Sequence, residues 1–379
     1  MKTLFITNTY LRGRSGVVNA SKAFVNAFAA LSHSLTLVYP QDGNYLVEDI
    51  MGDNIEFVPV EDVRSKITKF LGILVGKTHR YSKEITALFD KKRFDVVVFD
   101  SSTVSFHLIK KAKKAGLKTI TIHHNYQVEY TKDDEKSIVR YPLLFWTYRF
   151  EKEAVCFSDL NLTLTKTDEI SLRKHYKETA DFDVISVFEH TRGGSVEVNE
   201  TDKRKMTFVI TGQLYSLQTV NSLLPWLENY YPLLKKTYPD EELIVTGRRP
   251  SQKLINACKE NGVVIIPSPE DIDAIVRSSD YYICPTALGS GMKLRIMDGL
   301  KNGLCVLTHK RSARGYEEMI SRGVVYEYDD EKSFLASLKA MVNSKKDHKT
   351  VLDTYYSWFS LESGISRLEA ILNRHQILK

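Results

Sequence analysis

A glycine-rich turn at residues 289–291 is the part of this sequence whose residue types point most directly to chemistry. It reads Gly-Ser-Gly, and Lys293 and Arg295 follow it at the start of a predicted helix. Small residues let backbone N–H groups approach a ligand closely, and the positive end of a helix favours an anion at the same point. The turn therefore predicts an anion site. The alternative is a tight turn in which Arg295 pairs with Asp298 on a solvated helix face.

Two strands and one helix are predicted to position this turn. Residues 281–284 form an apolar run that ends at Pro285, and residues 304–307 form a second run rich in strand-favouring residues. Between them, Met292, Ile296 and Leu300 recur at helical spacing. The order is therefore strand, loop, helix, strand.

The same stretch resembles the donor-nucleotide motif of retaining GT-B glycosyltransferases, in particular family 4. In that motif a Gly-Ser-Gly-x-Lys turn opens a helix that ends in Glu-Ala-x-x-x-Gly. The resemblance extends upstream over residues 206–250 and fades in the first half of the chain. The matching positions are Gly289, Ser290, Gly291, Lys293 and Gly303, with Asp298 where the family has Glu.

The resemblance implies an α/β chain with the GT-B fold, in which two Rossmann-like, doubly wound domains face each other across a cleft. It also implies transfer of a sugar from a nucleotide-diphosphate sugar to an acceptor hydroxyl, with retention of anomeric configuration. The acceptor would be a growing surface glycan or its lipid-linked precursor, and no further cofactor is expected. Lys293 and the turn amides would stabilise the leaving diphosphate, and Asp298 would accept hydrogen bonds from the ribose.

Two positions depart from the family pattern. Active members commonly carry Glu-x7-Glu, but the position eight residues before Asp298 is Ser290. Many members also carry an Arg and a Lys soon after the first strand of this domain, and residues 213–221 contain neither. The phosphate charge would then come from Lys293, Arg295 or Arg248. A catalytically inactive GT-B protein that binds nucleotide or glycan beside a partner is therefore the alternative function.

Further donor-binding candidates follow other predicted strands. Gly212 follows the strand at residues 207–210, and Arg248 follows the strand at residues 243–246. An arginine at a strand end suits a diphosphate, because its guanidinium group can make two parallel hydrogen bonds. A solvated turn is an equally ordinary role for Arg248.

The first predicted strand leads into a second glycine-bearing loop, which contains Gly13 and Gly16. Their order does not fit the Gly-x-Gly-x-x-Gly fingerprint, which argues against a nicotinamide-dependent dehydrogenase. By resemblance, the loop would face the donor diphosphate. The alternative is an ordinary strand-to-helix turn.

Adjacent histidines end the predicted strand at residues 118–122. Buried, hydrogen-bonded core histidines are one explanation for them. By resemblance, a histidine within a His-Asn pair reaches the donor sugar. His124 and Asn125 are therefore the catalytic candidates, and His123 is the second choice. No third ligand at suitable spacing accompanies them, so neither zinc nor another metal is expected.

Strands and helices alternate along the whole chain, which predicts doubly wound parallel sheets with ligands beyond the carboxyl ends of the strands. In the first half, strands are predicted at residues 4–7, 35–39, 55–58, 95–99, 118–122, 160–164 and 183–187, and helices at residues 17–31, 83–89 and 104–115. In the second half, strands are predicted at residues 207–210, 243–246, 263–266, 281–284, 304–307 and 323–328, and helices at residues 220–236, 271–277, 332–342 and 361–378.

Length and composition set the domain count. A chain of 379 residues with 43% hydrophobic content can form two cores. Residues 191–205 are polar, with a glycine pair and no apolar period, and are predicted to be a linker. The expected domains are residues 1–190 and 206–350. By resemblance, residues 351–379 form helices that cross back to the first domain.

Charge, cysteine content and hydrophobic runs limit the expected cellular location and the expected classes of binding partner. The net charge is +6, but the basic residues are spread along the chain, so a nucleic-acid partner is not expected. The four cysteines show no metal or disulfide spacing and are expected to be buried. No run is long enough to span a membrane, and the start lacks the pattern of a signal peptide, which predicts a cytoplasmic protein.

Two segments have compositions typical of contact surfaces. Residues 64–83 mix lysines and arginines with aliphatic side chains, as in basic amphipathic helices that lie on anionic membranes. This permits peripheral contact with the inner membrane face, although a helix packed on the sheet is the favoured alternative. Residues 141–150 hold five aromatics and are expected to form a buried helix.

Overall fold

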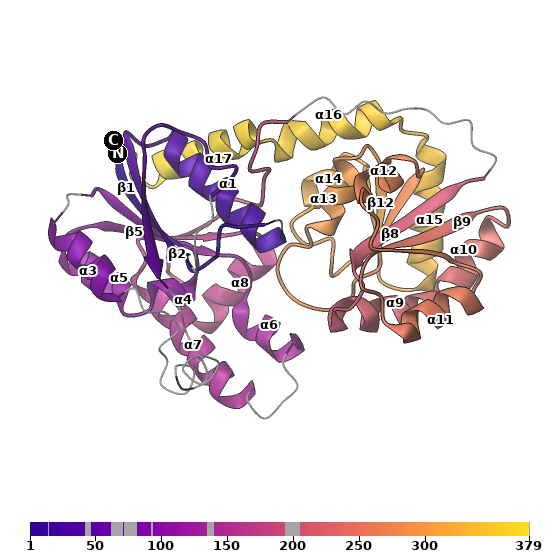
Figure 1. The fold of residues 1–379 in the computed structure, drawn as a ribbon, viewed down its shortest axis with the longest axis horizontal. Helices are drawn as coiled ribbons and strands as arrows, with labels where there is room; N and C mark the ends of the chain where they lie inside the picture. The colour runs from indigo at the N-terminus through magenta and orange to yellow at the C-terminus, as the bar shows by residue number, and fades with distance from the viewer. Residues whose placement is uncertain are drawn as a thin grey trace. The chain divides into compact units, whose positions relative to one another are not determined.

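The computed structural model describes residues 1–13, 15–41, 47–61, 71, 82–91, 94–134, 140–193 and 205–378. The chain divides into two compact units (Figure 1). Unit 1 contains residues 1–193 and 359–379, and unit 2 contains residues 194–358. Each unit has a parallel sheet packed with helices, so the predicted α/β class with two doubly wound sheets is confirmed.

Unit 1 is built on a seven-stranded sheet in the order β3-β2-β1-β4-β5-β6-β7 among its described residues. The short central strands read as continuous apolar runs because both sheet faces are covered; all four residues of β4 are buried. From β1 to β3 each new strand is added on one side of the sheet, and from β4 to β7 on the other side. The switch point of the sheet therefore lies between β1 and β4. The strands are β1 (Lys2–Ile6), β2 (Ser34–Gln41), β3 (Ile55–Glu61), β4 (Val96–Phe99), β5 (Lys118–His123), β6 (Leu160–Thr163) and β7 (Phe182–Val184).

The helices of unit 1 differ from the predicted ones at one break. Residues 104–115 were expected to form one helix, but His107 has a left-handed backbone (φ 62°), which no continuous α-helix can contain. The chain therefore forms α4 and α5 on either side of it. The described helices are α1 (Gly16–Ala30), α3 (Ser82–Lys91), α4 (Ser102–Ser105), α5 (Leu108–Lys114), α6 (Gln127–Asp134), α7 (Arg140–Phe157), α8 (Lys166–His175) and α17 (Leu361–Arg374).

The last helix, α17, packs inside unit 1. A Cβ atom at Gly364 would lie 2.2 Å from the Phe188 ring, so glycine is needed for this close approach. Arg374 Nη1 donates to Asp183 Oδ2 at 2.7 Å, which ties the end of α17 to β7. Residues distant in sequence thus complete one core.

Unit 2 is built on a six-stranded sheet in the order β10-β9-β8-β11-β12-β13 among its described residues. Its switch point lies between β8 and β11. The predicted helix at residues 220–236 is divided at Tyr230. The second helix begins at Tyr231 and has Pro232 in its first turn, where the missing N–H of proline is tolerated. The strands are β8 (Thr207–Gln213), β9 (Glu242–Arg248), β10 (Val264–Pro267), β11 (Tyr281–Cys284), β12 (Cys305–His309) and β13 (Val325–Tyr328). The helices are α9 (Leu217–Asn229), α10 (Tyr231–Thr237), α11 (Gln252–Glu260), α12 (Ile272–Arg277), α13 (Arg295–Leu300), α14 (Glu317–Ser321), α15 (Glu331–Ser344) and α16 (His348–Phe359).

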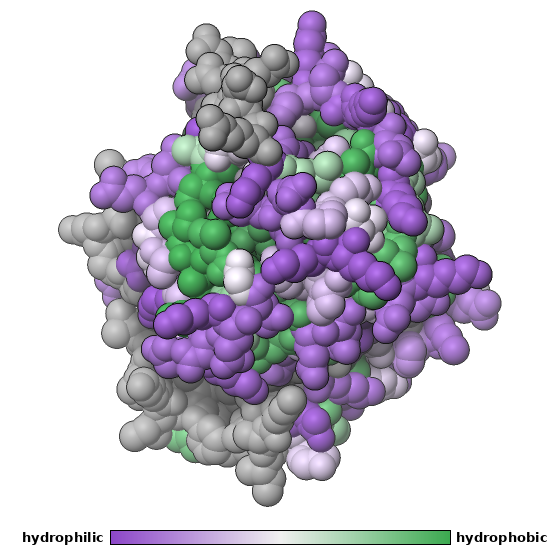
Figure 2. Space-filling view, turned by 90° about the vertical axis from the view of Figure 1, so that its right-hand side faces the viewer, coloured by the Kyte–Doolittle hydropathy of each residue, from purple (hydrophilic) through white to green (hydrophobic). Residues whose placement is uncertain are grey.

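The surface seen in Figure 2 is the side of the molecule on which β9, α10 and α11 lie, and its hydrophobic side chains are bordered by hydrophilic ones. On the edge strand β10, Val264 is 41% exposed. Among the described helices, none combines the length and the apolar character needed to cross a lipid bilayer.

Two predicted segments lie largely outside the described residues, and one of the four cysteines departs from the expected burial. The basic segment at residues 64–83 lies outside the described residues except at Leu71 and the start of α3, and residues 194–204 of the expected linker also lie outside them. Of the cysteines, three are buried, but Cys156 is only partly buried.

Candidate functional site

The Gly-Ser-Gly turn lies at the carboxyl end of β11, beside the switch point of the unit 2 sheet. Gly289 and Gly291 have left-handed backbones (φ 82° and 73°) that side chains strongly disfavour. A Cβ atom at Gly289 would also lie 2.7 Å from Lys293 Nζ. Both glycines are therefore required by the shape of the turn, which folds back over Lys293.

Lys293 is held against this turn. Its Nζ donates to the Ser290 carbonyl at 3.1 Å. Burial, together with the nearby charges of Arg311, Arg295 and Arg314, lowers the pKa of Lys293 to about 8. Cations from more than one element thus gather at the turn, and a bound anion would relieve their mutual repulsion.

Arg295 does not make the solvated pair with Asp298 that was the structural alternative. Its Nη2 donates to Thr219 Oγ1 at 2.8 Å, at the start of α9. Asp298 instead pairs with Lys301 Nζ at 3.0 Å. Desolvation raises the pKa of Asp298, but 42% of the side chain is exposed and the ion pair favours the charged form. With this exposure, an Asp298 oxygen can accept a hydrogen bond from a ligand.

The helix after the turn is shorter than expected. It was predicted to open directly at the Gly-Ser-Gly turn, but α13 begins at Arg295, so Lys293 precedes its first residue. The left-handed backbone of Gly291 excludes that residue from a right-handed helix, and residues 292–294 are needed to turn the chain. The turn amides are therefore not the helix terminus, and any anion site there depends on the turn and the cations.

Gly212 was predicted as a donor-binding residue, and its surroundings give it a specific role. A Cβ atom there would lie 2.6 Å from Arg295 Cζ. The guanidinium group therefore lies directly on the Gly212 backbone. The glycine at this position makes room for Arg295.

Sequence reasoning missed two groups at the same turn. Arg311, after β12, donates from Nε to the Gly289 carbonyl at 3.2 Å. Gln218, on α9, has a buried Nε2 without a hydrogen-bond partner among the described residues, and its Oε1 would lie 3.1 Å from a Cβ atom at Gly289. Arg311 follows a strand at the carboxyl edge, so the rule that polar residues at strand ends line ligand sites could have found it.

Arg248 takes a less central place. It ends β9, opposite Gln213 in the strand register, and it is exposed. It therefore lies at the carboxyl edge of the unit 2 sheet without a described contact to the Gly-Ser-Gly turn.

A second polar cluster lies at the switch point of the unit 1 sheet. Asp100, directly after β4, is buried and accepts three hydrogen bonds. The donors are Thr7 Oγ1 at 2.7 Å, Ser21 Oγ at 2.6 Å and His124 Nε2 at 2.7 Å. The ends of β1, β4 and β5 are thereby joined through one carboxyl group, which fixes the ring of His124.

The two histidines occupy different environments. His123 is buried, its Nε2 lies 3.0 Å from Asn161 Oδ1, and burial lowers its pKa to about 4, so it is a neutral core residue. His124 keeps 18% of its side chain exposed, and Asn125 is partly exposed. The structure thus places the His-Asn pair, rather than His123, where a ligand can reach it.

The chain after this pair is anchored by two buried carboxyl groups that the sequence did not indicate. Glu151, on α7, accepts from the Gln127 backbone N–H at 2.6 Å, and Asp168, on α8, accepts from the Tyr126 N–H at 3.0 Å. Burial raises the pKa of Glu151 to about 8. These bonds fix the start of α6 and with it the segment that carries His124.

The first glycine loop combines two conformations. Gly13 has a left-handed backbone (φ 71°), and no atom lies within 4 Å of a Cβ placed there, so the loop leaves open space beside it. Gly16 is the first residue of α1, whose N-terminus is capped by Ser15. Both fit a strand-to-helix turn, and Arg14 between them lies outside the described residues.

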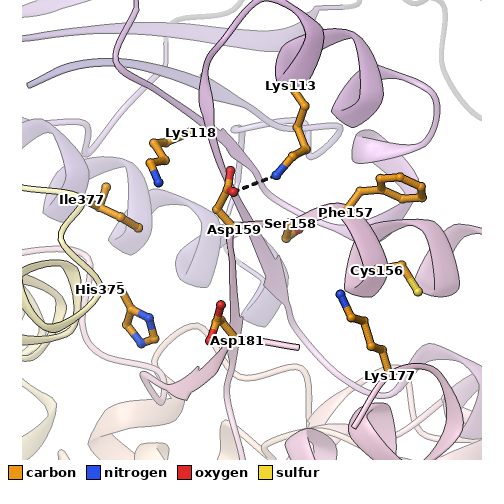
Figure 3. A pocket seen from close by; sticks show the side chains of 10 residues that line it. All are labelled: Lys113, Lys118, Cys156, Phe157, Ser158, Asp159, Lys177, Asp181, His375 and Ile377. Atoms are coloured by element: carbon orange, nitrogen blue, oxygen red, sulfur yellow. Dashed lines mark hydrogen bonds and ion pairs between the residues drawn. The ribbon is translucent and has the colours of Figure 1, made fainter. Parts of the chain in front are cut away.

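A cavity of about 380 Å³ also lies in unit 1, but at the opposite end of its sheet (Figure 3). Lys118, Asp159 and Asp181, at the amino ends of β5, β6 and β7, line it together with the partly buried Cys156. Lys113 and Asp159 form an ion pair at 2.7 Å across it. Because its residues come from the amino ends of the strands, it is separate from the His124 cluster.

Gly212→Ala should weaken the binding of a nucleoside diphosphate about tenfold, because the new methyl group must displace the Arg295 guanidinium. A double-mutant cycle with Arg295→Ala tests the cause. Calorimetric titration should show that Gly212→Ala has almost no additional effect once Arg295 is absent. An equal loss in both backgrounds would mean that Gly212 does not act through Arg295.

Comparisons with known proteins agree with the fold and show which residues match a known family. Residues 205–344, which include the Gly-Ser-Gly turn, match the family model described as glycosyl transferases group 1. A Klebsiella pneumoniae protein, "Uncharacterized 44.6 kDa protein in cps region", is 24% identical over 266 residues. That match covers 65% of this chain and 64% of the relative, so the chain spans just under two thirds of its relative's length.

Solved structures cover almost the whole chain at low identity. Sucrose-phosphate synthase from Thermosynechococcus elongatus is 10% identical, with a TM-score of 0.70 and 98% of each chain covered. The lipopolysaccharide outer core galactosyltransferase WaaB is 12% identical, with a TM-score of 0.64 and 99% of each chain covered. Anabaena HepE in complex with UDP-glucose is 11% identical, with a TM-score of 0.62, and the match covers 99% of this chain and 100% of that chain. The predicted GT-B fold is confirmed.

Proposed function

We propose that this protein is a glycosyltransferase that moves a sugar from a nucleotide-diphosphate sugar to an acceptor hydroxyl, with retention of anomeric configuration. The observation that carries the proposal is the turn at residues 289–293, where the partly buried Lys293 lies near three arginines at the switch point of the unit 2 sheet. This turn lies within the part of the chain that matches group 1 transferases. The cations suit a diphosphate, which needs charge compensation when it leaves.

Separate roles follow for the two clusters. Lys293, Arg295 and the turn amides would hold the diphosphate, and the partly exposed Asp298 would accept from the ribose hydroxyls. In unit 1, His124 and Asn125 would contact the sugar. Asp100 would keep the His124 ring in one orientation, because its carboxyl group accepts from His124 Nε2.

The names of two similar proteins bear on the acceptor class. The name of the Klebsiella pneumoniae relative places that protein in a cps region, and WaaB is named as a lipopolysaccharide galactosyltransferase. Both names favour a surface polysaccharide or a glycolipid as the product. We therefore propose a glycan or lipid-linked acceptor.

A donor-hydrolysis assay tests the proposal. The protein is incubated with a panel of nucleotide sugars, and the slow release of free nucleotide is measured. Release from one donor supports the transferase. Binding without release supports the alternative of an inactive partner protein, which Ser290 in place of the first family acid would favour. Stabilisation by NAD alone would contradict both.

Donor turnover should survive an excess of EDTA. The Asp-x-Asp at residues 271–273 is of a type that could hold a metal beside a diphosphate, but both of its carboxyl groups have structural partners. Asp271 caps α12 by accepting from the Ala274 N–H at 2.9 Å, and Asp273 accepts from Asn302 Nδ2 at 3.0 Å. Asp273→Asn should therefore lower the melting temperature rather than the rate. Activity that is abolished by EDTA and restored by manganese would overturn this expectation.

A further inference from the structure

Helix α7 exposes a stripe of aromatic side chains, although residues 141–150 were expected to form a buried helix. Tyr141 is 66% exposed, Phe145 is 57% exposed and Tyr148 is 40% exposed. Their spacing of four and three residues places them on one face of the helix. The opposite face packs into unit 1 through Phe150 and Ala154. We call Tyr141, Phe145 and Tyr148 the aromatic stripe.

The exposed charges that α7 itself carries beside the stripe are positive among its described residues. Arg140 Cζ lies 5.5 Å from the centre of the Tyr141 ring, and Lys152 Nζ lies 5.9 Å from the centre of the Tyr148 ring. Arg149 is exposed on the same side. The acidic residues of α7, Glu151 and Glu153, are buried. The exposed face of the described helix therefore combines aromatic rings with cations and presents no carboxylate.

The position of α7 in unit 1 follows from two hydrogen bonds. Glu151 binds the start of α6, just beyond the carboxyl end of β5. The Asp159 N–H, after the end of α7, donates to the Thr119 carbonyl near the amino end of β5. The helix thus runs from the carboxyl side to the amino side of the sheet, and Tyr141, ten residues before Glu151, lies about 15 Å further out. Figure 1 shows this first part of α7 extending past the sheet.

We propose that the aromatic stripe of α7 docks onto the interface of an anionic lipid bilayer. Tyrosine and other amphipathic rings favour the headgroup level of a membrane, where arginine and lysine can extend toward phosphate. Anionic headgroups would complement Arg140, Arg149 and Lys152. A second copy of the chain, paired through the same face, would place these cations against one another. A glycan chain would find a convex helix rather than a groove.

The docking would bring a membrane to the carboxyl edge of the unit 1 sheet, where His124 lies. This fits a lipid-linked acceptor, but the docking itself needs no catalytic activity. A protein without membrane binding could therefore still be a transferase, and a protein without transferase activity could still bind the membrane. It also places the contact on α7 rather than on residues 64–83.

Vesicle flotation of the full chain at low salt tests the proposal. The vesicles contain phosphatidylglycerol and phosphatidylcholine, with pure phosphatidylcholine as the comparison. The parent protein should float with the anionic vesicles and much less with the neutral ones. Tyr141→Ser with Phe145→Ser, and separately Arg149→Glu with Lys152→Glu, should each lower the partition coefficient about tenfold or more.

Matched controls use exposed residues of unit 2. Leu217, which is 63% exposed, is changed to Ser, and the exposed Lys332 and Lys339 of α15 are changed to Glu. These variants should float as the parent does, and thermal unfolding should show that the α7 variants remain folded. Absence of parent binding, or equal binding by the α7 variants, would overturn the proposal. So would a loss seen only with Lys66→Glu and Lys69→Glu, or a change in self-association of the α7 variants without lipid.

Discussion

Lys293→Ala should weaken the binding of a nucleoside diphosphate by about 1.5 to 3 kcal/mol, which is the cost of losing one charge-assisted hydrogen bond. The effect follows from the position of Nζ, which is held over the Gly-Ser-Gly turn and surrounded by other cations. Binding of the matching nucleoside, which has no phosphate, should change far less. Calorimetric titration with both ligands separates the two effects, and an equal loss for both would remove Lys293 from the phosphate site.

A matched variant and a pH series sharpen this test. Lys310, which is 62% exposed and directly precedes Arg311, offers a control. Lys310→Ala removes the same charge from a side chain outside the turn. Because the free protein has a Lys293 pKa of about 8 and a bound anion raises it, protonated Lys293 favours binding. Affinity should therefore decrease as the pH rises above about 8. Lys293→Met should show a flatter profile over the same range.

His124→Ala should lower donor turnover about a hundredfold while leaving nucleotide affinity almost unchanged. The proposed contact of His124 is with the sugar, and loss of one positioned hydrogen-bonding side chain at the reacting group typically has an effect of this size on turnover. Initial rates of nucleotide release, together with titration of the nucleoside diphosphate, measure both quantities. Full activity in the variant would move the sugar site away from this strand end.

His123→Ala gives the contrasting result. It removes a buried side chain and its hydrogen bond with Asn161, so it should lower the free energy of unfolding by about 2 to 4 kcal/mol. Donor turnover per folded molecule should stay near that of the parent. If His123→Ala instead reduced turnover and His124→Ala did not, the choice within the pair would be wrong.

The sheets could be predicted because their signal is local. Buried parallel strands are short apolar runs, and β11 has the predicted bounds of residues 281–284. The helix breaks at His107 and Tyr230 were missed, since they depend on a left-handed residue and on which of several possible turns the packing selects. The exposure of the α7 aromatics was missed for a related reason. The sequence of an aromatic-rich helix does not indicate which of its faces packs against the rest of the protein.

The site was predicted only where its residues follow one another in sequence. The turn, Lys293 and the His-Asn pair belong to such stretches. Arg311 and Glu151 come from other elements, and their importance lies in contacts across 22 and 24 positions of sequence. No spacing rule connects them, because only the folded sheets bring them together.

The packing of α17 on residues of the first unit has a consequence for biosynthesis. Unit 1 is made of the earliest and the latest residues of the chain, with residues 194–358 between them. At ribosomal rates of about 5 to 20 residues per second, the interval takes about 10 to 30 s. During that time the Phe188 ring lacks the covering helix that Gly364 later brings against it. The nascent first domain must wait, incomplete, until α17 has been synthesised, and a message truncated before α17 would yield a protein that never closes its first core.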